Sequence, residues 1–237
     1  MIRLIFSTLF LLVLAVIAYL LLWPVPIDPV AWEAPVNEGY TDAFAPNEDL
    51  EEIERIGLNG LSGPEDAAIG PDGRVYMATH EGKIARYDPA TGSVDVFAET
   101  GGRPLGVEFS SDGVLYVADA YIGLLQITPE GVVTVLASQT EDGSPIEYAD
   151  DLDIAPDGSI YFTDASTKFG AVASGGTLPG SFLELMEHGS NGRVLRYHPD
   201  SGKTAVVQTG LNFANGLAMT ADGTHYLVIE SVNKLNL

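Results

Sequence analysis

Two patterns of hydrophobic and polar residues divide the chain. Residues 4–23 form an apolar run without a charge, in which Ser7 and Thr8 are the polar members. A run of about 20 such residues makes a helix about 30 Å long, enough to cross the hydrocarbon core of a bilayer. From residue 63 onward, short β-branched and aromatic runs alternate with Gly, Pro and Asp, as in strands joined by tight turns. The pattern predicts a membrane-spanning helix followed by an all-β domain.

The apolar run fits either an uncleaved membrane anchor or a cleaved signal peptide. Signal peptides have shorter apolar regions, of about 7–15 residues, and a cleavage site between small residues. The residues that follow, Trp23-Pro24-Val25-Pro26, make a poor cleavage site, which favours the anchor. Arg3 precedes the run, so the positive-inside rule leaves the amino terminus in the cytoplasm. We predict an anchor at 1–23, a linker at 24–49 and a β domain at 50–237 on the extracytoplasmic side, in a periplasmic, lumenal or extracellular compartment.

The β domain is built from a repeated unit. Four copies align on Asp-Gly turns whose aspartates are Asp72, Asp112, Asp157 and Asp222. Four antiparallel strands recurring every ~40–45 residues are the signature of a β-propeller blade. A single β-sandwich stays an alternative, although it would not explain regular copies. In the first copy we predict strands at Asp66–Ile69, Val75–Thr79, Lys83–Tyr87 and Val94–Phe97.

Two segments lie outside this repeat pattern. Ile53–Leu58 precedes the first copy and predicts one additional short strand. The third copy carries an insertion at Lys168–Asn191, in which Ser181–His188 predicts one or two helical turns. Insertions in repeat folds collect on one face of the molecule, often the binding face, so we expect this helix to lie over one face of the propeller.

The alignment brings oxygen-bearing side chains to one position of the repeat. Seven residues before each turn aspartate lie Glu65, Leu105, Asp150 and Asn215. Equivalent positions of successive blades form a ring around the propeller axis, so two carboxylates and an amide are expected around one channel. Oxygen ligands suit Ca²⁺, and a cation would relieve the repulsion between the carboxylates. The competing interpretation is that each of these residues only caps a turn.

A second position of the repeat, after the hairpin, carries Thr79, Asp119, Asp164 and, one residue later, Glu230. We predict that these side chains cap turns. Arg86 and Arg196 match each other in the third strands, and we predict that they brace neighbouring blades.

Composition narrows the range of partners and chemistry. The 33 acidic residues outnumber the 11 basic ones, for a net charge of −22. Nucleic acids select basic surfaces, so we expect no nucleic-acid partner. The chain has no cysteine, which excludes disulfides and thiolate chemistry.

Several motifs together resemble a known family. They are GPED, RPLG, LYVADAYIGLL, ADDLDI, YFTDAS, NGRVLRY and FANGLA, spread over residues 63–231. The set resembles the strictosidine synthase-like group, which is related to paraoxonases and to the gluconolactonase/regucalcin family. The resemblance implies a six-bladed propeller, of which about four blades are present here, with Ca²⁺ in its central tunnel. It implies Glu65, Asp150 and Asn215 as metal ligands and Asp151 as a second contact or an orienting group. In a hydrolase, either Asp150 or Asp151 would serve as the catalytic base, and Asp151 is our candidate.

The sequence also departs from that group. Asp150 stands where relatives often have Asn, while Leu105 and Ala120 stand where paraoxonases carry their two catalytic histidines. The sequence Val232–Leu237 replaces the continuation expected in relatives, so we expect the fifth and sixth blades to be absent and the chain to be a truncated form of a longer protein.

The function predicted first is a membrane-anchored, Ca²⁺-dependent hydrolase of lactones or esters. The alternatives are a non-catalytic propeller that binds a ligand or partner, an inactive fragment of a longer enzyme and, least favoured, a condensing enzyme like strictosidine synthase.

Overall fold

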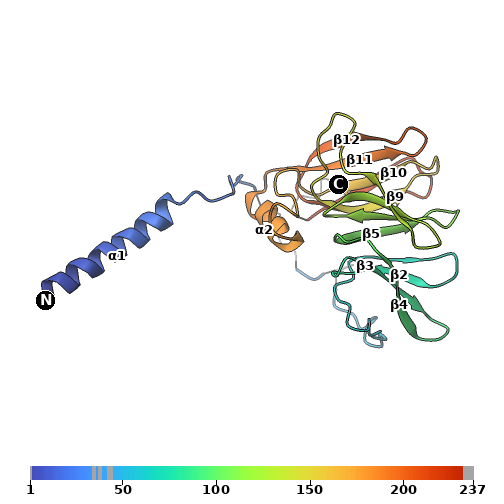
Figure 1. Ribbon diagram of the computed structural model, residues 1–237, viewed down its shortest axis with the longest axis horizontal. Coiled ribbons are helices and arrows are strands. Elements are labelled where there is room, and N and C mark those ends of the chain that lie inside the picture. Colours follow the sequence, from blue (N-terminus) through green and yellow to red (C-terminus); the bar gives the residue numbers. More distant parts are fainter. Residues whose placement is uncertain (1, 34–35, 37–38, 42–44, 232–237) are drawn as a thin grey trace.

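The computed structural model describes residues 2–33, 36, 39–41 and 45–231. Its first element is α1 (Ile2–Leu22), a helix that extends away from the β domain (Figure 1). An 18-residue window within residues 3–22 has a mean hydropathy of 2.8, and none of its residues is buried. Length and composition allow this helix to cross a membrane, although a signal sequence near the amino terminus has the same features. The predicted apolar helix is therefore confirmed, and its cellular role stays a prediction.

The first blade is a four-stranded antiparallel sheet whose strands follow one another in chain order. Its turn at Asp72-Gly73 shows why the Asp-Gly pair recurs. Gly73 has a φ of 76°, which costs glycine little because it has no Cβ, and the Asp72 carboxylate accepts the backbone N–H of Arg74 at 3.1 Å. The strands agree with the predicted ones to within two residues: β1 (Ala67–Ile69), β2 (Val75–Ala78), β3 (Lys83–Asp88) and β4 (Ser93–Glu99).

The next two blades repeat this topology. The second blade consists of β5 (Pro104–Phe109), β6 (Leu115–Asp119), β7 (Gly123–Ile127) and β8 (Val133–Ala137). The third consists of β9 (Ala149–Ile154), β10 (Ile160–Asp164), β11 (Gly192–His198) and β12 (Lys203–Leu211).

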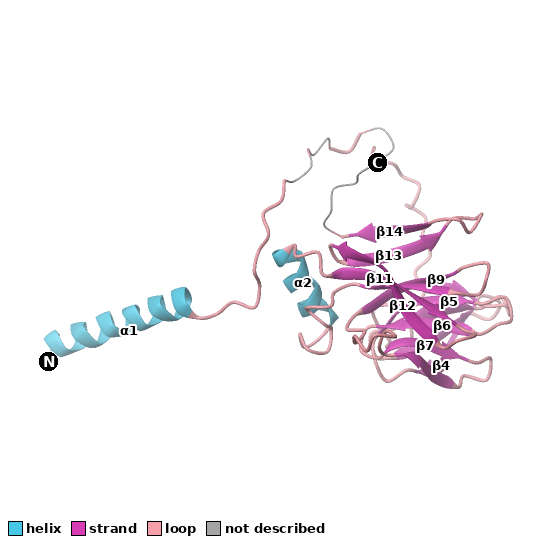
Figure 2. Ribbon diagram, turned by 90° about the horizontal axis from the view of Figure 1, so that it is seen from above, coloured by secondary structure: helices cyan, strands magenta, loops and turns pink. Residues whose placement is uncertain are grey.

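The insertion in the third blade forms α2 (Thr177–Glu187) between β10 and β11, which confirms the predicted helix and extends it toward the amino terminus. It lies at the edge of the β domain nearest to α1 (Figures 1 and 2).

The fourth repeat supplies two described strands, β13 (Ala214–Met219) and β14 (Tyr226–Glu230), which pair antiparallel. The predicted break in the family pattern at 232–237 lies outside the described residues. On this pair, Leu227 and Ile229 are 62% and 66% exposed. The described part of the chain therefore forms three complete blades and one pair of strands, as a partial propeller does (Figure 2).

Neighbouring blades are held together by apolar side chains. One cluster joins the first and second blades around Ile84 and Leu125, and another joins the second and third around Leu124 and Phe162. All four side chains are fully buried, and burying each such side chain stabilises the fold by about 1.5–3 kcal/mol. The inner strands β1, β5, β9 and β13 contact one another in that order, so the repeat determines which residues meet at the axis.

The predicted strand at Ile53–Leu58 is wrong. These residues adopt no regular secondary structure, and Ile53 and Ile56 are 54% and 43% exposed. A strand is stable only when its N–H and C=O groups pair with a neighbour. Here the following turn is attached instead through a side chain, since Asn59 donates its amide N–H to the Val94 carbonyl at 3.0 Å.

Candidate functional site

The four ring positions lie around one cavity, as the alignment predicts. The cavity has a volume of about 130 Å³ and lies where the inner strands begin. It is lined by Glu65, Asp66, Leu105, Gly106, Asp150, Asp151 and Asn215. Residues up to 150 positions apart in the sequence therefore share one small polar space because each begins the inner strand of its own blade.

Irregular strand pairing shapes this cavity. In the second, third and fourth blades the pairing between the first and second strands shifts at the ring position, next to Leu105, Asp150 and Asn215 respectively. A β-bulge redirects a side chain that regular pairing would hold in line with the sheet. In the first blade Glu65 lies just before β1, although its N–H still bonds to the Ala78 carbonyl at 3.2 Å. The ring position therefore belongs to the inner strand in three blades and precedes it in one.

Asp150 is the most unusual member of the ring. It is 5% exposed, yet its carboxylate accepts no hydrogen bond within the described part of the chain. Burial raises the pKa of Asp150 well above its ordinary value of 3.8, and the charges of Glu65 and Asp151 raise it further. The Arg103 guanidinium opposes this shift. Burying a carboxylate without donors is costly, so this position is suited to a ligand that brings positive charge.

Arg103 is a residue of the site that the sequence reasoning missed. It is 5% exposed, and its Nη2 lies 3.5 Å from Glu65 Oε2. The guanidinium also donates to the Pro104 and Gly63 carbonyls at 2.9 and 3.4 Å, while its buried Nε has no partner among the described residues. The sequence does hint at this role, because Arg103 is the basic residue of the RPLG motif and lies two positions before the ring residue Leu105. It supplies one positive charge beside two carboxylates.

Asn215 completes the set of oxygen-bearing ring residues. Its Nδ2 donates to Ser231 Oγ at 3.3 Å, and its backbone carbonyl accepts the Thr163 hydroxyl at 3.0 Å. The side-chain Oδ1 accepts no hydrogen bond from the residues that the structure describes. Its lone pairs therefore stay free for a ligand in the cavity.

Asp151 joins the third blade to the fourth. Its Oδ2 accepts the Leu217 N–H at 2.7 Å and its Oδ1 accepts the Leu152 N–H at 2.9 Å. Burial, as the largest cause, raises the pKa of Asp151 to about 6, although the two backbone donors oppose the shift. Asp66 makes the corresponding bond between the first and second blades, where its Oδ2 accepts the Val107 N–H at 2.9 Å. Both residues therefore bind backbone across a blade boundary.

Close packing at this junction explains one glycine of the ring. A Cβ at Gly106 would lie 2.7 Å from the Cα of Asp151 and 2.9 Å from the Asp150 carbonyl oxygen. Heavy atoms do not approach so closely without a shift of the backbone. Gly106 therefore allows the inner strand of the third blade to approach the second, and this approach brings Asp150 to the cavity.

The second repeat position has the predicted capping role. Asp164 Oδ1 accepts the Tyr148 N–H at 2.8 Å, and its Oδ2 accepts Arg193 Nε at 2.8 Å. Asp119 Oδ1 accepts the Arg103 N–H at 2.9 Å, and Glu230 Oε1 accepts the Asn212 N–H at 2.6 Å. Each carboxylate thus holds the chain that enters the inner strand of its own blade.

The predicted role of Arg86 as a brace between blades is wrong. Arg86 pairs with Asp95 at 2.6 Å, and Asp95 lies on β4 of the same blade. Residues on adjacent strands of one sheet are nearer to each other than to the next blade, so the ion pair forms within the sheet. The matching Arg196 has a buried Nε without a partner in the described chain.

Helix α2 covers the ring end of the propeller. Its Leu185 packs on a cluster that includes Leu105, Tyr148 and Phe213, and the Tyr148 hydroxyl donates to the Thr177 carbonyl at 3.0 Å. The insertion therefore lies over the face at which the cavity opens, as we predicted.

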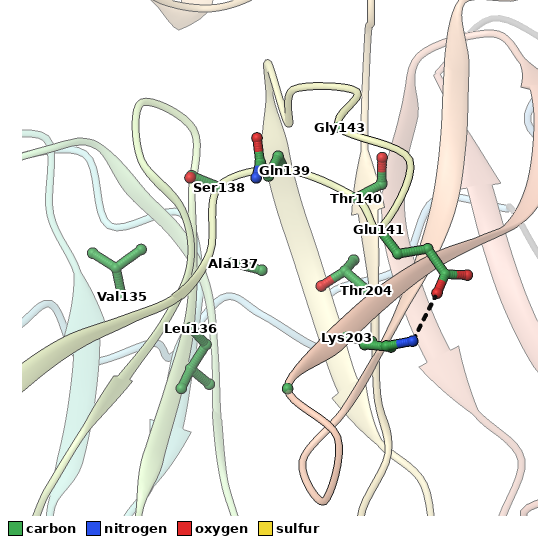
Figure 3. A pocket seen from close by; sticks show the side chains of 11 residues that line it. Val135, Leu136, Ala137, Ser138, Gln139, Thr140, Glu141, Gly143, Lys203 and Thr204 are labelled. Atoms are coloured by element: carbon green, nitrogen blue, oxygen red, sulfur yellow. Dashed lines mark ion pairs between the residues drawn. The ribbon is translucent and has the colours of Figure 1, made fainter.

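A larger cavity, of about 510 Å³, lies between β8 and β12 (Figure 3). Its charged residues are Glu141 and Lys203, which are 3.9 Å apart and mostly exposed. No group of residues there carries the concentration of unpaired oxygen atoms found in the ring. We therefore consider the ring cavity as the candidate site.

The ring residues suit a hard cation in the kind of ligand they offer. Two carboxylates and an amide present oxygen atoms, and no described residue donates a hydrogen bond to the Asp150 carboxylate. Ca²⁺ usually takes 6–8 oxygen ligands, so three such side chains would make up only part of a coordination shell. Within the described residues, no three Asp, Glu, His or Cys side chains form a metal-binding group.

Family models and curated relatives point to the same family. Family models described as strictosidine synthase-like, N-terminal, and as strictosidine synthase match residues 42–87 and 150–236. Strictosidine synthase-like protein 3 of Arabidopsis thaliana is 32% identical over 75% of this chain and 50% of its own length. The adipocyte plasma membrane-associated protein of Salmo salar is 33% identical over 93% of this chain and 55% of its own length. The chain spans about half the length of the curated relatives it matches.

Among solved structures, a gluconolactonase from Xanthomonas campestris is similar with a TM-score of 0.58 and 18% identity, over 74% of this chain and 60% of that one. A virginiamycin B lyase from Staphylococcus aureus has a TM-score of 0.51 and 17% identity, over 75% of this chain and 52% of that one. At this level of identity the likeness concerns the fold, which is that of a β-propeller.

Proposed function

The chain belongs to the strictosidine synthase-like family, and from this premise we propose that it is a membrane-anchored, calcium-dependent hydrolase of lactones or esters. The observation that carries the proposal is the environment of Asp150. This carboxylate is buried, accepts no hydrogen bond within the described chain, and shares a cavity with Glu65 and Asn215. Such a site is unfavourable when empty and is stabilised by a bound cation.

Glu65, Asp150 and Asn215 are the residues that would hold the ion. A Ca²⁺ bound there would act as a Lewis acid toward the carbonyl of a lactone or ester. The protein's own part is to keep these oxygen atoms in place. Asp66 and Asp151 do so by joining the inner strands across blade boundaries, and Arg103 limits the negative charge beside Glu65.

Asp151 is the candidate general base. Its raised pKa, about 6, suits a group that exchanges protons near neutral pH. Both of its oxygen atoms accept hydrogen bonds from backbone N–H groups. To act as a base, one of these oxygen atoms must accept a second hydrogen bond, from a water molecule. The gluconolactonase named among the fold neighbours motivates lactones as the first substrates to test.

Leu105 favours a second candidate function, a propeller that binds a ligand without transforming it. This ring residue is 3% exposed and apolar, so it offers neither a proton acceptor nor a ligand to the cavity. A site with two carboxylates, one amide and one leucine can hold a cation or a cationic ligand without chemistry.

Calcium titration calorimetry of the full chain in detergent tests the ring. We expect Glu65→Gln and Asn215→Ala each to weaken Ca²⁺ binding by about tenfold or more, equivalent to about 1.4 kcal/mol per tenfold. Asp200→Asn, at an exposed turn outside the cavity, serves as the matched control and should leave binding unchanged. Equal affinity in all four proteins would refute the calcium site.

A panel of lactones and aryl esters then separates the two candidate functions. A hydrolase should lose its activity when a chelator is added and regain it with Ca²⁺. Calcium binding without turnover of any substrate would favour the binding propeller, whereas turnover that is indifferent to chelator would exclude the metal-dependent mechanism.

A further inference from the structure

The linker that follows α1 is bound to α2. The backbone N–H of Asp28 donates to Glu187 Oε2 at 2.8 Å, and the N–H of Val30 donates to the Glu187 carbonyl at 2.8 Å. Trp32 stacks on His188, with ring centroids 4.8 Å apart and planes 12° from parallel. Residues 28–32 therefore form a strap over the carboxyl-terminal end of α2.

The outward face of α2 is apolar and uncharged. Leu178, Phe182 and Met186 follow one another at intervals of four residues, so they share one face of the helix, and they are 64%, 54% and 64% exposed. The two acidic residues of the helix, Glu184 and Glu187, point inward and are 0% and 4% exposed. In a protein with a net charge of −22, a helix that buries its charges and exposes its large apolar side chains is suited to an apolar environment.

The strap also limits how far this face can lie from the end of α1. Five residues lie between Leu22 and Asp28, so the chain takes six steps from one to the other, and an extended chain spans at most about 3.6 Å per step. Asp28, which is bonded to the end of α2, therefore lies within about 22 Å of the end of α1. Met186, the last residue of the apolar face, is adjacent to the strapped Glu187.

We propose that the Leu178–Phe182–Met186 face of α2 lies on the surface of the same lipid bilayer that α1 enters. The inference rests on the anchor part of the proposed function and extends it. Helices with one apolar face lie in the plane of the interface and bury that face by about 5–10 Å. With α1 and α2 both in contact with lipid, the propeller would be held with its ring end toward the bilayer, because α2 covers that end.

The absence of cysteine from the chain allows a site-specific test in the full-length protein. Phe182→Cys and, as a matched control, Val132→Cys would each carry an environment-sensitive fluorophore. Val132 is 58% exposed, close to the value of Phe182. It lies in the turn between β7 and β8, and strand order places that turn at the end of the blades opposite to α2.

Both labelled chains would be reconstituted into phosphatidylcholine vesicles and isolated by flotation. We expect the label at 182 to be quenched by spin-labelled lipid and protected from aqueous iodide, and the label at 132 to show the reverse. In a Leu178→Ser, Met186→Ser background, the label at 182 should become accessible to iodide while the chain still floats.

The possible outcomes test the contact of α2 with lipid separately from the anchoring of α1 in the membrane. A chain that floats with equal iodide access at both labels would overturn the α2 contact and leave the anchor intact. A chain that does not float would overturn both. Protection at 182 that disappears when the protein-to-lipid ratio is lowered would identify a second copy of the chain as the occupant and would also overturn the lipid contact.

Discussion

Asp150 and Asp164 lie in the same blade, 14 residues apart, and both are shielded from solvent. Asp164 accepts hydrogen bonds from two backbone N–H groups and from Arg193, whereas Asp150 accepts none within the described chain. Burial raises the pKa of both, but at Asp164 these donors hold it to about 6, while at Asp150 the pKa rises well above its ordinary value because Glu65 and Asp151 add to the effect.

The number of hydrogen-bond donors around a buried carboxylate therefore distinguishes one that stabilises the fold from one that is suited to bind a ligand. A buried charge that is surrounded by donors stabilises the chain around it, and removing it exposes those donors to an apolar environment. A buried charge without donors destabilises the fold until a ligand arrives. The two aspartates should therefore respond to substitution in opposite ways.

The largest effect is expected from Asp164→Ala. The change leaves the Arg193 guanidinium buried without its ion-pair partner, which costs about 3–5 kcal/mol of unfolding free energy. Urea unfolding of the detergent-solubilised chain measures this loss. The control Asp200→Ala, at an exposed turn, should stay within about 0.5 kcal/mol of the parent. A loss as small as that of the control would show that Asp164 is not a structural centre.

Asp150→Asn should have the opposite sign. In chelator, we expect the unfolding free energy to stay level or to rise by about 1 kcal/mol, because a buried charge without donors is replaced by a neutral group of the same shape. The stabilisation by added Ca²⁺ that we expect of the parent should be lost in the variant. If Asp150→Asn is destabilised in chelator as strongly as Asp164→Ala, both aspartates stabilise the fold, and the proposed difference between them is wrong.

Asp151→Asn tests a carboxylate with fewer donors than Asp164 and more than Asp150. An amide keeps one acceptor, so we expect a loss of about 1.5–3 kcal/mol from the weakened bonds to Leu217 and Leu152. For a residue that only joins blades, hydrolysis should fall no further than the folded fraction does. A large drop in kcat in a fully folded variant would instead support Asp151 as the base.

The smallest effect on stability is expected from Glu65→Gln in chelator. Its partner Arg103 is 3.5 Å away, and the Glu65 side chain is 53% exposed. Ion pairs with an exposed member contribute about 0–1 kcal/mol, so thermal unfolding should hardly change. Together with the weakened Ca²⁺ binding expected above, this would assign Glu65 to the ligand rather than to the fold. A loss of several kcal/mol of unfolding free energy would show that Glu65, like Asp164, stabilises the fold.

Much of the fold could be predicted because it is local and repeated. The Asp-Gly turns and the alternating apolar runs identify the strands to within two residues in the first blade, and four copies imply a ring. The ring also predicts that Glu65, Asp150 and Asn215 share a cavity, since equivalent positions of successive blades meet at the axis. The error at Ile53–Leu58 has the same origin, because local propensity does not show whether a partner strand is present.

The apolar helix, the order of the blades and the side chains around the axis can be read from residue spacing alone, because they depend on periodicity and on the length of the repeat. Four features could be seen in the folded structure alone. They are the donors around each carboxylate, the contact between Arg103 and Glu65, the pairing of Arg86 within its own sheet, and the binding of residues 28–32 to α2. Each of these contacts depends on backbone groups or on segments far apart in the chain. Their positions follow from packing between blades, which residue spacing does not encode.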